Sequence, residues 1–328
     1  CAMPMKDADE YRHPSPSSDP KELWGDTVWI STVDREANIF GINHFHFTNR
    51  NYARFEALYV IDGVLQQYGN KVPLDPEPDN GPWTDGVLTY EVVEPQKAVR
   101  VVMDGPRFGF DLTYTGRFPM FDYFDHVNNP FATGMGGHNE QGMLCTGEFE
   151  IRGGPNKGSR RQLNSYSHRD HSWSHRFAEE VEWEWETISR PGHYWPSIQT
   201  DRFHLNTFGI LGSGNLPDGQ TYPGAGFIST AEGGTEHIKG SSGEVLWADG
   251  NRNAASFRYE ITLPDDEVIH VRTGRKYGQV KLWDRGENDL ENRLDCYEPF
   301  FDFEIEETGE KGYGVCEYSV GPPNPRWL

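Results

Sequence analysis

The densest set of side chains able to do chemistry lies between residues 168 and 176. This run reads His-Arg-Asp-His-Ser-Trp-Ser-His-Arg, so it holds three histidines, two arginines and an aspartate. Charges at that density are costly to bury unless they pair with one another. Successive side chains of an extended segment alternate between two faces. We therefore expect one face to carry Arg169, His171, Trp173 and His175, and the other to carry His168, Asp170, Ser172 and Ser174.

Proton transfer is the chemistry that these residue types favour. Imidazole has the side-chain pKa nearest neutrality, and a neighbouring carboxylate sets its tautomer and raises its pKa. We expect His171 to act with Asp170, and His138 to act with Glu140, which shares a face with it in a second extended segment. Two structural interpretations stay open. In the first, Arg169 and Asp170 belong to an ion-pair network that joins two domains. In the second, His138 is a solvated loop residue.

Two further sets of rings alternate along their segments. His44 and His46 share one face and alternate with two phenylalanines. Histidines at i and i+2 can bind a metal if a third ligand comes from elsewhere, or they lie on a wet outer face. Because no carboxylate motif accompanies them, we expect no metal. Trp183 and Trp185 alternate with glutamates, which predicts a strand whose indoles point inward, either to line a hydrophobic pocket or to fill the core.

The elements that must position these residues are predicted to be strands. Short runs of alternating character, such as residues 27–33, 39–47 and 54–61, are separated by Gly, Asn and Asp turns. The 36 glycines and 22 prolines agree with a loop-rich β architecture. The best helical candidate is short and lies within residues 119–128. A Gly/Asn/Pro-rich stretch follows at 128–137, and each half has enough strands for a barrel or a sandwich.

Composition excludes several classes of partner. Thirty basic against 51 acidic residues give a net charge of −21, so we expect no nucleic-acid partner and repulsion from anionic lipid. No apolar run is long enough to span a bilayer, so we expect no membrane insertion. The aromatic content of 13% argues against a disordered acidic chain. The four cysteines form no C-x-x-C pair, and with no visible signal peptide we predict a cytoplasmic protein.

Two motifs resemble a known superfamily. H-N-E-Q at residues 138–141, followed by R-D-H-S-W-S-H-R at 169–176, resembles the H-Y-E-Q … R-D-H-S-W-G-x-R pattern of bacterial relatives of the carotenoid 1,2-hydratase and AttH-like lipocalins. Residues 312–318 resemble the G-Y-G-x-x-E-[YH] ending of that group. Asn139 and Ser174 depart from the pattern, where Tyr and Gly are usual. The resemblance implies two tandem lipocalin-like antiparallel β-barrels, hydrophobic substrates, and catalysis without a metal or redox cofactor.

We therefore predict an N-terminal extension over residues 1–20, one barrel over 21–175 and a second over 176–328. The predicted function is that of a cofactor-independent lyase or isomerase, meaning a hydratase, dehydratase or double-bond isomerase. Its substrate would be a hydrophobic terpenoid or aromatic small molecule, processed by acid–base catalysis.

The predicted site residues have two roles. The catalytic ones are His171, Asp170, His138 and Glu140, and those in contact with substrate are Arg169, Trp173, His175, His44, His46, Trp183 and Trp185. Two alternatives to this function stay open: a lyase that breaks a C–C bond in a lignin-type aromatic dimer, and a non-catalytic carrier of hydrophobic ligands. The sequence also leaves a homodimer open.

Overall fold

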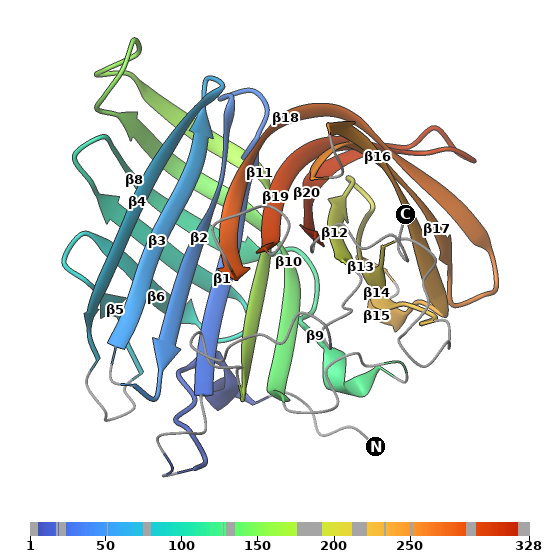
Figure 1. Ribbon diagram of the computed structural model, residues 1–328, viewed down its shortest axis with the longest axis horizontal. Coiled ribbons are helices and arrows are strands. Elements are labelled where there is room, and N and C mark those ends of the chain that lie inside the picture. Colours follow the sequence, from blue (N-terminus) through green and yellow to red (C-terminus); the bar gives the residue numbers. More distant parts are fainter. Residues whose placement is uncertain are drawn as a thin grey trace. The chain divides into compact units, whose positions relative to one another are not determined.

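Strand-forming patterns recur along the whole chain, and the structure, a computed structural model, is accordingly all-β (Figure 1). It describes residues 6–17, 19, 24–50, 52–74, 80–126, 128, 135–175, 192–211, 222–232, 234–249, 252–286 and 293–320. The chain forms two compact units, residues 1–125 with 131–177 and residues 126–130 with 178–328. Each unit is built on one curled antiparallel sheet, which confirms the predicted fold class of tandem lipocalin-like barrels.

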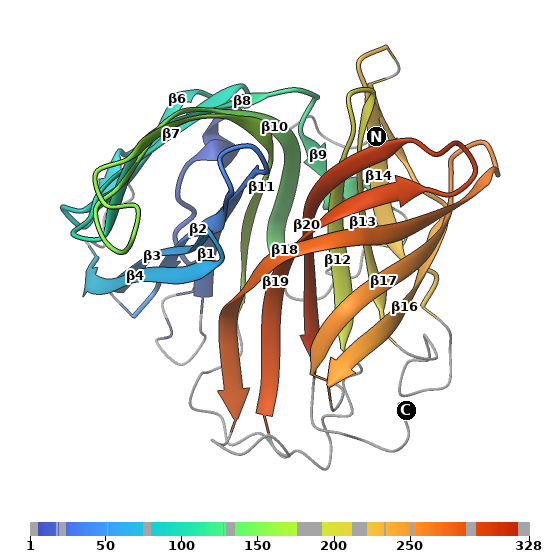
Figure 2. The same ribbon diagram turned by 90° about the horizontal axis from the view of Figure 1, so that it is seen from above.

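Unit 1 contains an eleven-stranded sheet among its described residues. Its elements are η1 (Asp7–Glu10), β1 (Trp24–Asp34), β2 (Ile39–Thr48), β3 (Tyr52–Ile61), β4 (Val64–Pro73), β5 (Trp83–Thr84), β6 (Leu88–Glu94), β7 (Ala98–Asp104), β8 (Phe108–Gly116), β9 (Phe121–Asp122), η2 (Tyr123–Asp125), β10 (Met135–Ile151) and β11 (Arg160–His175). The strand order is β4-β3-β2-β1-β11-β10-β8-β7-β6-β5, with β9 paired to β10. Figure 2 shows the curl, with β3 and β4 beneath the arch of β6, β7 and β8.

Unit 2 repeats this plan with nine strands among its described residues. They are β12 (His193–Gln199), β13 (Phe203–Ile210), β14 (Ala225–Thr230), β15 (Gly234–His237), β16 (Gly240–Asp249), β17 (Asn253–Thr262), β18 (Val268–Gly286), β19 (Arg293–Ile305) and β20 (Lys311–Val320). Their order is β15-β14-β13-β12-β20-β19-β18-β17-β16. In both units, therefore, the first long strand of the unit pairs with its last.

Local sequence explains the turns of unit 1. Asp62 and Gly63 both have positive φ, 52° and 77°, which is the backbone that a two-residue hairpin turn between β3 and β4 needs. The short helix expected within residues 119–128 is a 3₁₀ turn over Tyr123–Asp125. Within the described residues, no helix has the length and apolar character needed to cross a membrane.

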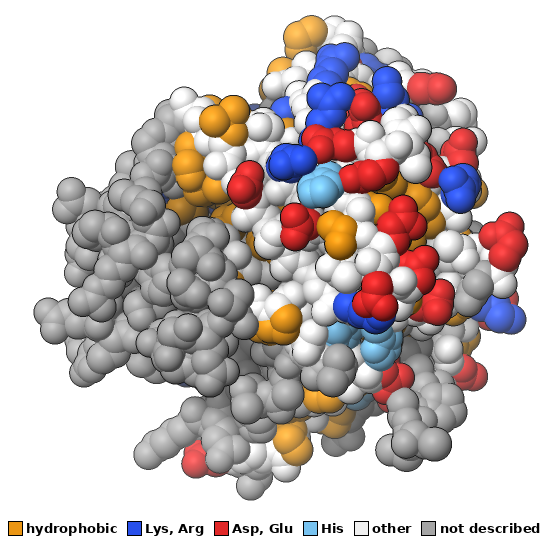
Figure 3. Space-filling view, turned by 90° about the vertical axis from the view of Figure 1, so that its right-hand side faces the viewer, with side chains coloured by type: hydrophobic (Ala, Val, Ile, Leu, Met, Phe, Trp, Pro, Cys, Tyr) orange, Lys and Arg blue, Asp and Glu red, His pale blue; other side chains and the backbone are white. Residues whose placement is uncertain are grey.

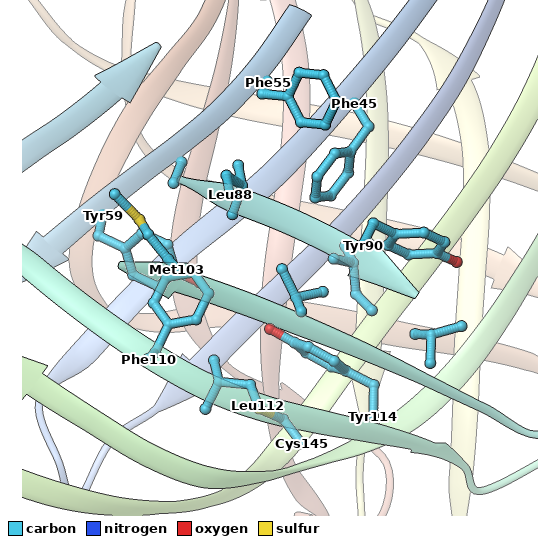
Figure 4. Packing of buried hydrophobic residues seen from close by; sticks show 14 of the residues in the cluster. Phe45, Phe55, Tyr59, Leu88, Tyr90, Met103, Phe110, Leu112, Tyr114 and Cys145 are labelled. Carbon is cyan, nitrogen blue, oxygen red and sulfur yellow. The ribbon is translucent and has the colours of Figure 1, made fainter. Parts of the chain in front are cut away.

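The core of unit 1 is an aromatic cluster on the concave side of its sheet. Figure 4 shows part of this cluster, with Phe45 of β2 next to Phe55 of β3. The centroid of the Phe45 ring lies 5.7 Å from that of Phe55 and 5.2 Å from that of Tyr90 of β6. A buried polar network lies inside this core, where the Thr32 hydroxyl is 2.8 Å from the Tyr114 hydroxyl. We call the sheet face that carries this cluster the core face and the opposite one the outer face.

Unit 2 has a core of its own, centred on buried rings such as Tyr194, Tyr259, Phe301 and Tyr318. Two carboxylates of this unit, Asp295 and Glu298, are also fully buried. On the face that Figure 3 presents, acidic groups are scattered among basic and uncharged ones. Residues 182–186, where the sequence predicts a strand of alternating glutamates and indoles, lie outside the described residues.

Candidate active site

Strand β11 lies between β1 and β10, and the register of these pairs fixes which residues share a face. Arg169 and His171 stand opposite residues of β1 that belong to the unit 1 core cluster, so both lie on the core face. Asp170, between them, lies on the outer face, directly opposite Glu140 of β10. The alternation expected from the sequence is therefore present, and it divides the charged run between two sites.

The outer face of β10 and β11 carries two histidines and two carboxylates, which we call the outer-face cluster: His138, Glu140, His168 and Asp170. His138 Nε2 lies 2.6 Å from Asp170 Oδ2 and 3.1 Å from Glu140 Oε1. The second Glu140 oxygen lies 3.0 Å from His168 Nε2. Three of these side chains are almost fully buried, whereas that of Asp170 is 19% exposed. Asp170 is therefore the member that a small molecule can reach.

The carboxylates of the outer-face cluster control the protonation of His138. Burial by itself lowers the pKa of His138, but Asp170 and then Glu140 outweigh it and raise that pKa to about 9. The imidazole is therefore protonated at neutral pH. Tyr123 of η2 stacks on His138 with ring centroids 5.0 Å apart, and Trp29 of β1 meets His168 edge-on at 5.7 Å. The outer-face cluster therefore combines a protonated imidazole, carboxylates and neighbouring aromatic rings.

A second cluster, the core-face cluster, consists of His13, Asp26, His171 and Trp173. His171 Nε2 lies 2.8 Å from Asp26 Oδ1, and His13 Nδ1 lies 3.2 Å from Asp26 Oδ2. Burial raises the pKa of Asp26, but His171 and His13 outweigh it and hold the pKa well below its ordinary value. His13 also stacks flat on Trp173, with centroids 3.6 Å apart.

Arg169 is bound by its own chain rather than facing open space. Its guanidinium makes two hydrogen bonds to the Glu10 carboxylate, at 2.7 and 2.9 Å, and a third to the Gln141 side-chain oxygen at 2.9 Å. Both partners of the ion pair are 2% exposed. The pair fixes η1 to the core face of β11, so the segment 6–17, predicted as part of an extension, packs into unit 1.

The remaining predicted site residues lie elsewhere or outside the described residues. His44 is on the outer face of β2, where its Nδ1 lies 2.8 Å from Glu56 Oε2. The centroids of the His44 and His46 rings are 6.2 Å apart. Trp183 and Trp185 lie outside the described residues, as does the side chain of His175. The structure thus brings His138, Glu140 and Asp170 together and leaves His44 with a carboxylate of its own.

One predicted pairing is wrong. His171 does not pair with Asp170, because consecutive residues of a strand point to opposite faces. The carboxylate partner of His171 is Asp26 from β1, and the imidazole partner of Asp170 is His138 from β10. His138 and Glu140 are in contact, with His138 Nε2 3.1 Å from Glu140 Oε1.

Sequence reasoning missed the contributions of Glu10, His13, Asp26 and Tyr123. Glu10 and His13 lie in a polar, Pro/Ser-rich stretch that gives no strand or helix signal of its own. Asp26 offered a weak signal, since it is an acid near the start of a strand whose other residues are mostly apolar or small. Tyr123 lies in the short helical candidate but carries no motif.

The fold and the two clusters define a tandem lipocalin-like protein with buried histidine–carboxylate pairs on both faces of its first sheet. The chain belongs to the family described as "Domain of unknown function (DUF7064)", whose pattern matches residues 6–322. No curated protein sequence matches the chain.

Solved structures share this fold at low sequence identity. Kievitone hydratase from Nectria haematococca is similar with a TM-score of 0.57 and 13% identity, over 97% of this chain and 93% of that one. CghA is similar with a TM-score of 0.60 and 11% identity, over 92% and 89%. CghA in complex with Sch210972 gives 0.59 and 10% over the same shares. These likenesses show the two-barrel fold.

Proposed function

We propose that this protein is an acid–base enzyme, a hydratase, dehydratase or double-bond isomerase, that acts on a hydrophobic small molecule at the outer-face cluster. The observation that carries the proposal is the His138–Asp170 contact of 2.6 Å, in which a protonated imidazole is buried behind a carboxylate that is partly exposed. A proton held in this way can pass through Asp170 to a substrate oxygen or alkene carbon.

The proposed reaction needs one proton and returns it. In the dehydration direction, the His138–Asp170 pair gives its proton to the leaving hydroxyl, the C–O bond breaks and water departs. The pair, now short of a proton, takes one from the neighbouring carbon as the double bond forms. Hydration is the reverse, and isomerisation is proton addition at one carbon and removal at another. Glu140 keeps His138 charged, and Tyr123 offers an aromatic face to developing positive charge.

The substrate class rests on two supports of different kind. Tyr123 and Trp29 place aromatic rings beside the outer-face cluster. Kievitone hydratase, one of the similar structures, gives the reaction type a precedent on this fold. The carrier alternative has less support, because the core face of unit 1 is filled by packed aromatic side chains, whereas a carrier needs an open apolar cavity.

A substrate panel tests the proposal. The purified protein is incubated in H₂¹⁸O with isoprenoid and aromatic alkenes and alcohols, kievitone among them, and mass spectrometry follows gain or loss of labelled water. We expect turnover that falls about 10²–10⁴-fold in Asp170→Asn and His138→Gln, since general acid–base groups contribute that much. His44→Gln, which removes an imidazole of the same face paired with a different carboxylate, is the matched control.

Three results would argue against the proposal. Wild-type turnover in folded Asp170→Asn and His138→Gln would remove the outer-face cluster from the reaction. Binding of panel members without conversion would favour the carrier. Cleavage of a lignin-type dimer, also placed in the panel, would favour the C–C lyase over a hydratase.

A further inference from the structure

We propose that His13, Asp26 and His171 form a binding site for one divalent transition-metal ion of the zinc type, on the core face of unit 1. The three residues come from three separate segments: the N-terminal stretch, β1 and β11. One ligand atom of each, a ring nitrogen or a carboxylate oxygen, lies within 4.8 Å of the other two. The site is distinct from the outer-face cluster, because His171 and Asp170 point to opposite faces of the sheet.

The donor set is one that zinc and its neighbours prefer. Imidazole nitrogen and carboxylate oxygen bind Zn²⁺ at about 2.0–2.2 Å, and three protein ligands leave a fourth position open for water. Tetrahedral bonds of that length separate neighbouring donor atoms by about 3.3 Å. The His13 Nδ1 atom lies 3.2 Å from Asp26 Oδ2, and the His171 Nε2 atom lies 2.8 Å from Asp26 Oδ1, so each imidazole faces one oxygen of the carboxylate. To reach the tetrahedral separation, the His171 contact has to widen by about half an ångström.

Burial and charge favour an ion at this place. The side chains of Asp26 and His171 are 1% and 5% exposed, and a carboxylate buried to that degree needs charged or hydrogen-bonding partners. A divalent cation would add positive charge beside Asp26 and would bind both imidazoles through a ring nitrogen. His13, whose side chain is 20% exposed, gives the ion a path from solvent.

Surrounding groups hold two of the ligands in orientation. The backbone N–H of His13 donates to Asp26 Oδ2 at 2.5 Å, and the Trp24 indole N–H donates to the His13 carbonyl at 2.8 Å. The His13 ring lies flat on Trp173, at an interplanar angle of 7°. Such outer contacts commonly orient metal ligands and tune their affinity. The ion would therefore tie the N-terminal segment to β1 and β11, in a structural role apart from proton transfer.

Two other groups of side chains come equally close together and provide the comparison. His138, Glu140 and Asp170 offer one imidazole against two carboxylates, and His193, Cys296 and Glu317 form the third group. Both ring nitrogens of His193 are already engaged, by Glu317 at 2.6 Å and by the Ser319 hydroxyl at 2.7 Å. Only the core-face cluster offers two imidazoles and one carboxylate among these three groups.

The test uses the full chain and the metals alone. Protein stripped with chelator is titrated with Zn²⁺ by calorimetry and with Co²⁺ by visible absorption. We expect one ion per chain, a tetrahedral Co²⁺ spectrum, and slower hydrogen exchange in residues 6–17 when Zn²⁺ is bound. Asp26→Asn and His171→Gln should weaken binding at least ~100-fold, beyond the loss typical for residues that only support a ligand.

Two features of the design keep the result decisive. His13→Ala lies in the N-terminal segment and leaves both buried strand positions intact, so it tests the site even where Asp26→Asn folds poorly. Glu140→Gln and Glu317→Gln disable the other two groups and should leave affinity unchanged. Wild-type protein that binds no Zn²⁺ at micromolar concentrations would overturn the proposal. So would binding that is lost in Glu140→Gln or Glu317→Gln but kept in His171→Gln.

Discussion

Replacing Glu10 with alanine should destabilise unit 1 more than any surface charge change. Glu10 and Arg169 are each 2% exposed and meet through two hydrogen bonds of 2.7 and 2.9 Å. Removing one partner of a buried pair leaves the other charge uncompensated, at a cost of about 3–5 kcal/mol. The guanidinium keeps Gln141 at 2.9 Å and the Tyr90 hydroxyl at 3.4 Å, so we expect the lower end, about 3 kcal/mol.

The assay is urea unfolding combined with hydrogen exchange, because the chain has two units and the loss must be assigned to one of them. Glu10→Ala should lower the unfolding free energy and speed exchange in β11, while exchange in β19 and β20 stays unchanged. Arg100→Ala is the matched control. It breaks a pair with Asp111 whose side chains are 42% and 52% exposed, and such a pair is worth at most about 1 kcal/mol. Equal losses in Glu10→Ala and Arg100→Ala would refute the reasoning.

Three further predictions concern the pH dependence, the polar core and the packing of unit 1. Burial lowers the pKa of His138, but its carboxylate neighbours raise that pKa to about 9. The protonated imidazole therefore contributes roughly 3 kcal/mol to the unfolding free energy below pH 6.5, and this contribution is lost as the pH rises through 9. Unfolding free energies measured from pH 6 to 10 should show this decrease in the wild type and not in His138→Gln. Tyr114→Phe removes a buried hydroxyl from a 2.8 Å hydrogen bond and should cost about 1–2 kcal/mol in urea unfolding, and a neutral result would mean that the network is not stabilising. A Cβ on Gly137 would lie 2.0 Å from the Trp173 ring, so Gly137→Ala should lower the unfolding free energy by about 1–3 kcal/mol and alter indole fluorescence. Gly69→Ala is the control and should do neither, because the nearest atom to its Cβ would lie at 4.0 Å.

Local alternation was enough to predict much of the fold. Residues 39–47 and 54–61 lie within β2 and β3, because a period of two is a property of the segment alone. The same rule placed Arg169 and His171 on one face and Asp170 on the other. The Asp62-Gly63 turn was also predictable, since the residue types favour positive φ.

Partners across the sheet were not predictable, because they depend on a register between distant segments. Asp26 and His171 are 145 residues apart, and nothing in either segment says that β1 pairs with β11. Glu10 and Arg169 are 159 residues apart, and Glu10 lies in a stretch without periodicity. The pairing of side chains across a sheet depends on which strands are neighbours, and a local sequence pattern does not specify those neighbours.

The pairing of β1 with β11 has a consequence for how the chain is made. During synthesis β1 leaves the ribosome first and presents an unpaired edge until residues 160–175 follow it. Unit 1 therefore cannot complete its sheet co-translationally until residues 160–175 have been made, and its Glu10–Arg169 contact forms only then. An exposed strand edge is a template for wrong pairing. Nascent chains that end before residue 160 are therefore the species that should need chaperones, and unit 2 meets the same delay because β12 waits for β20.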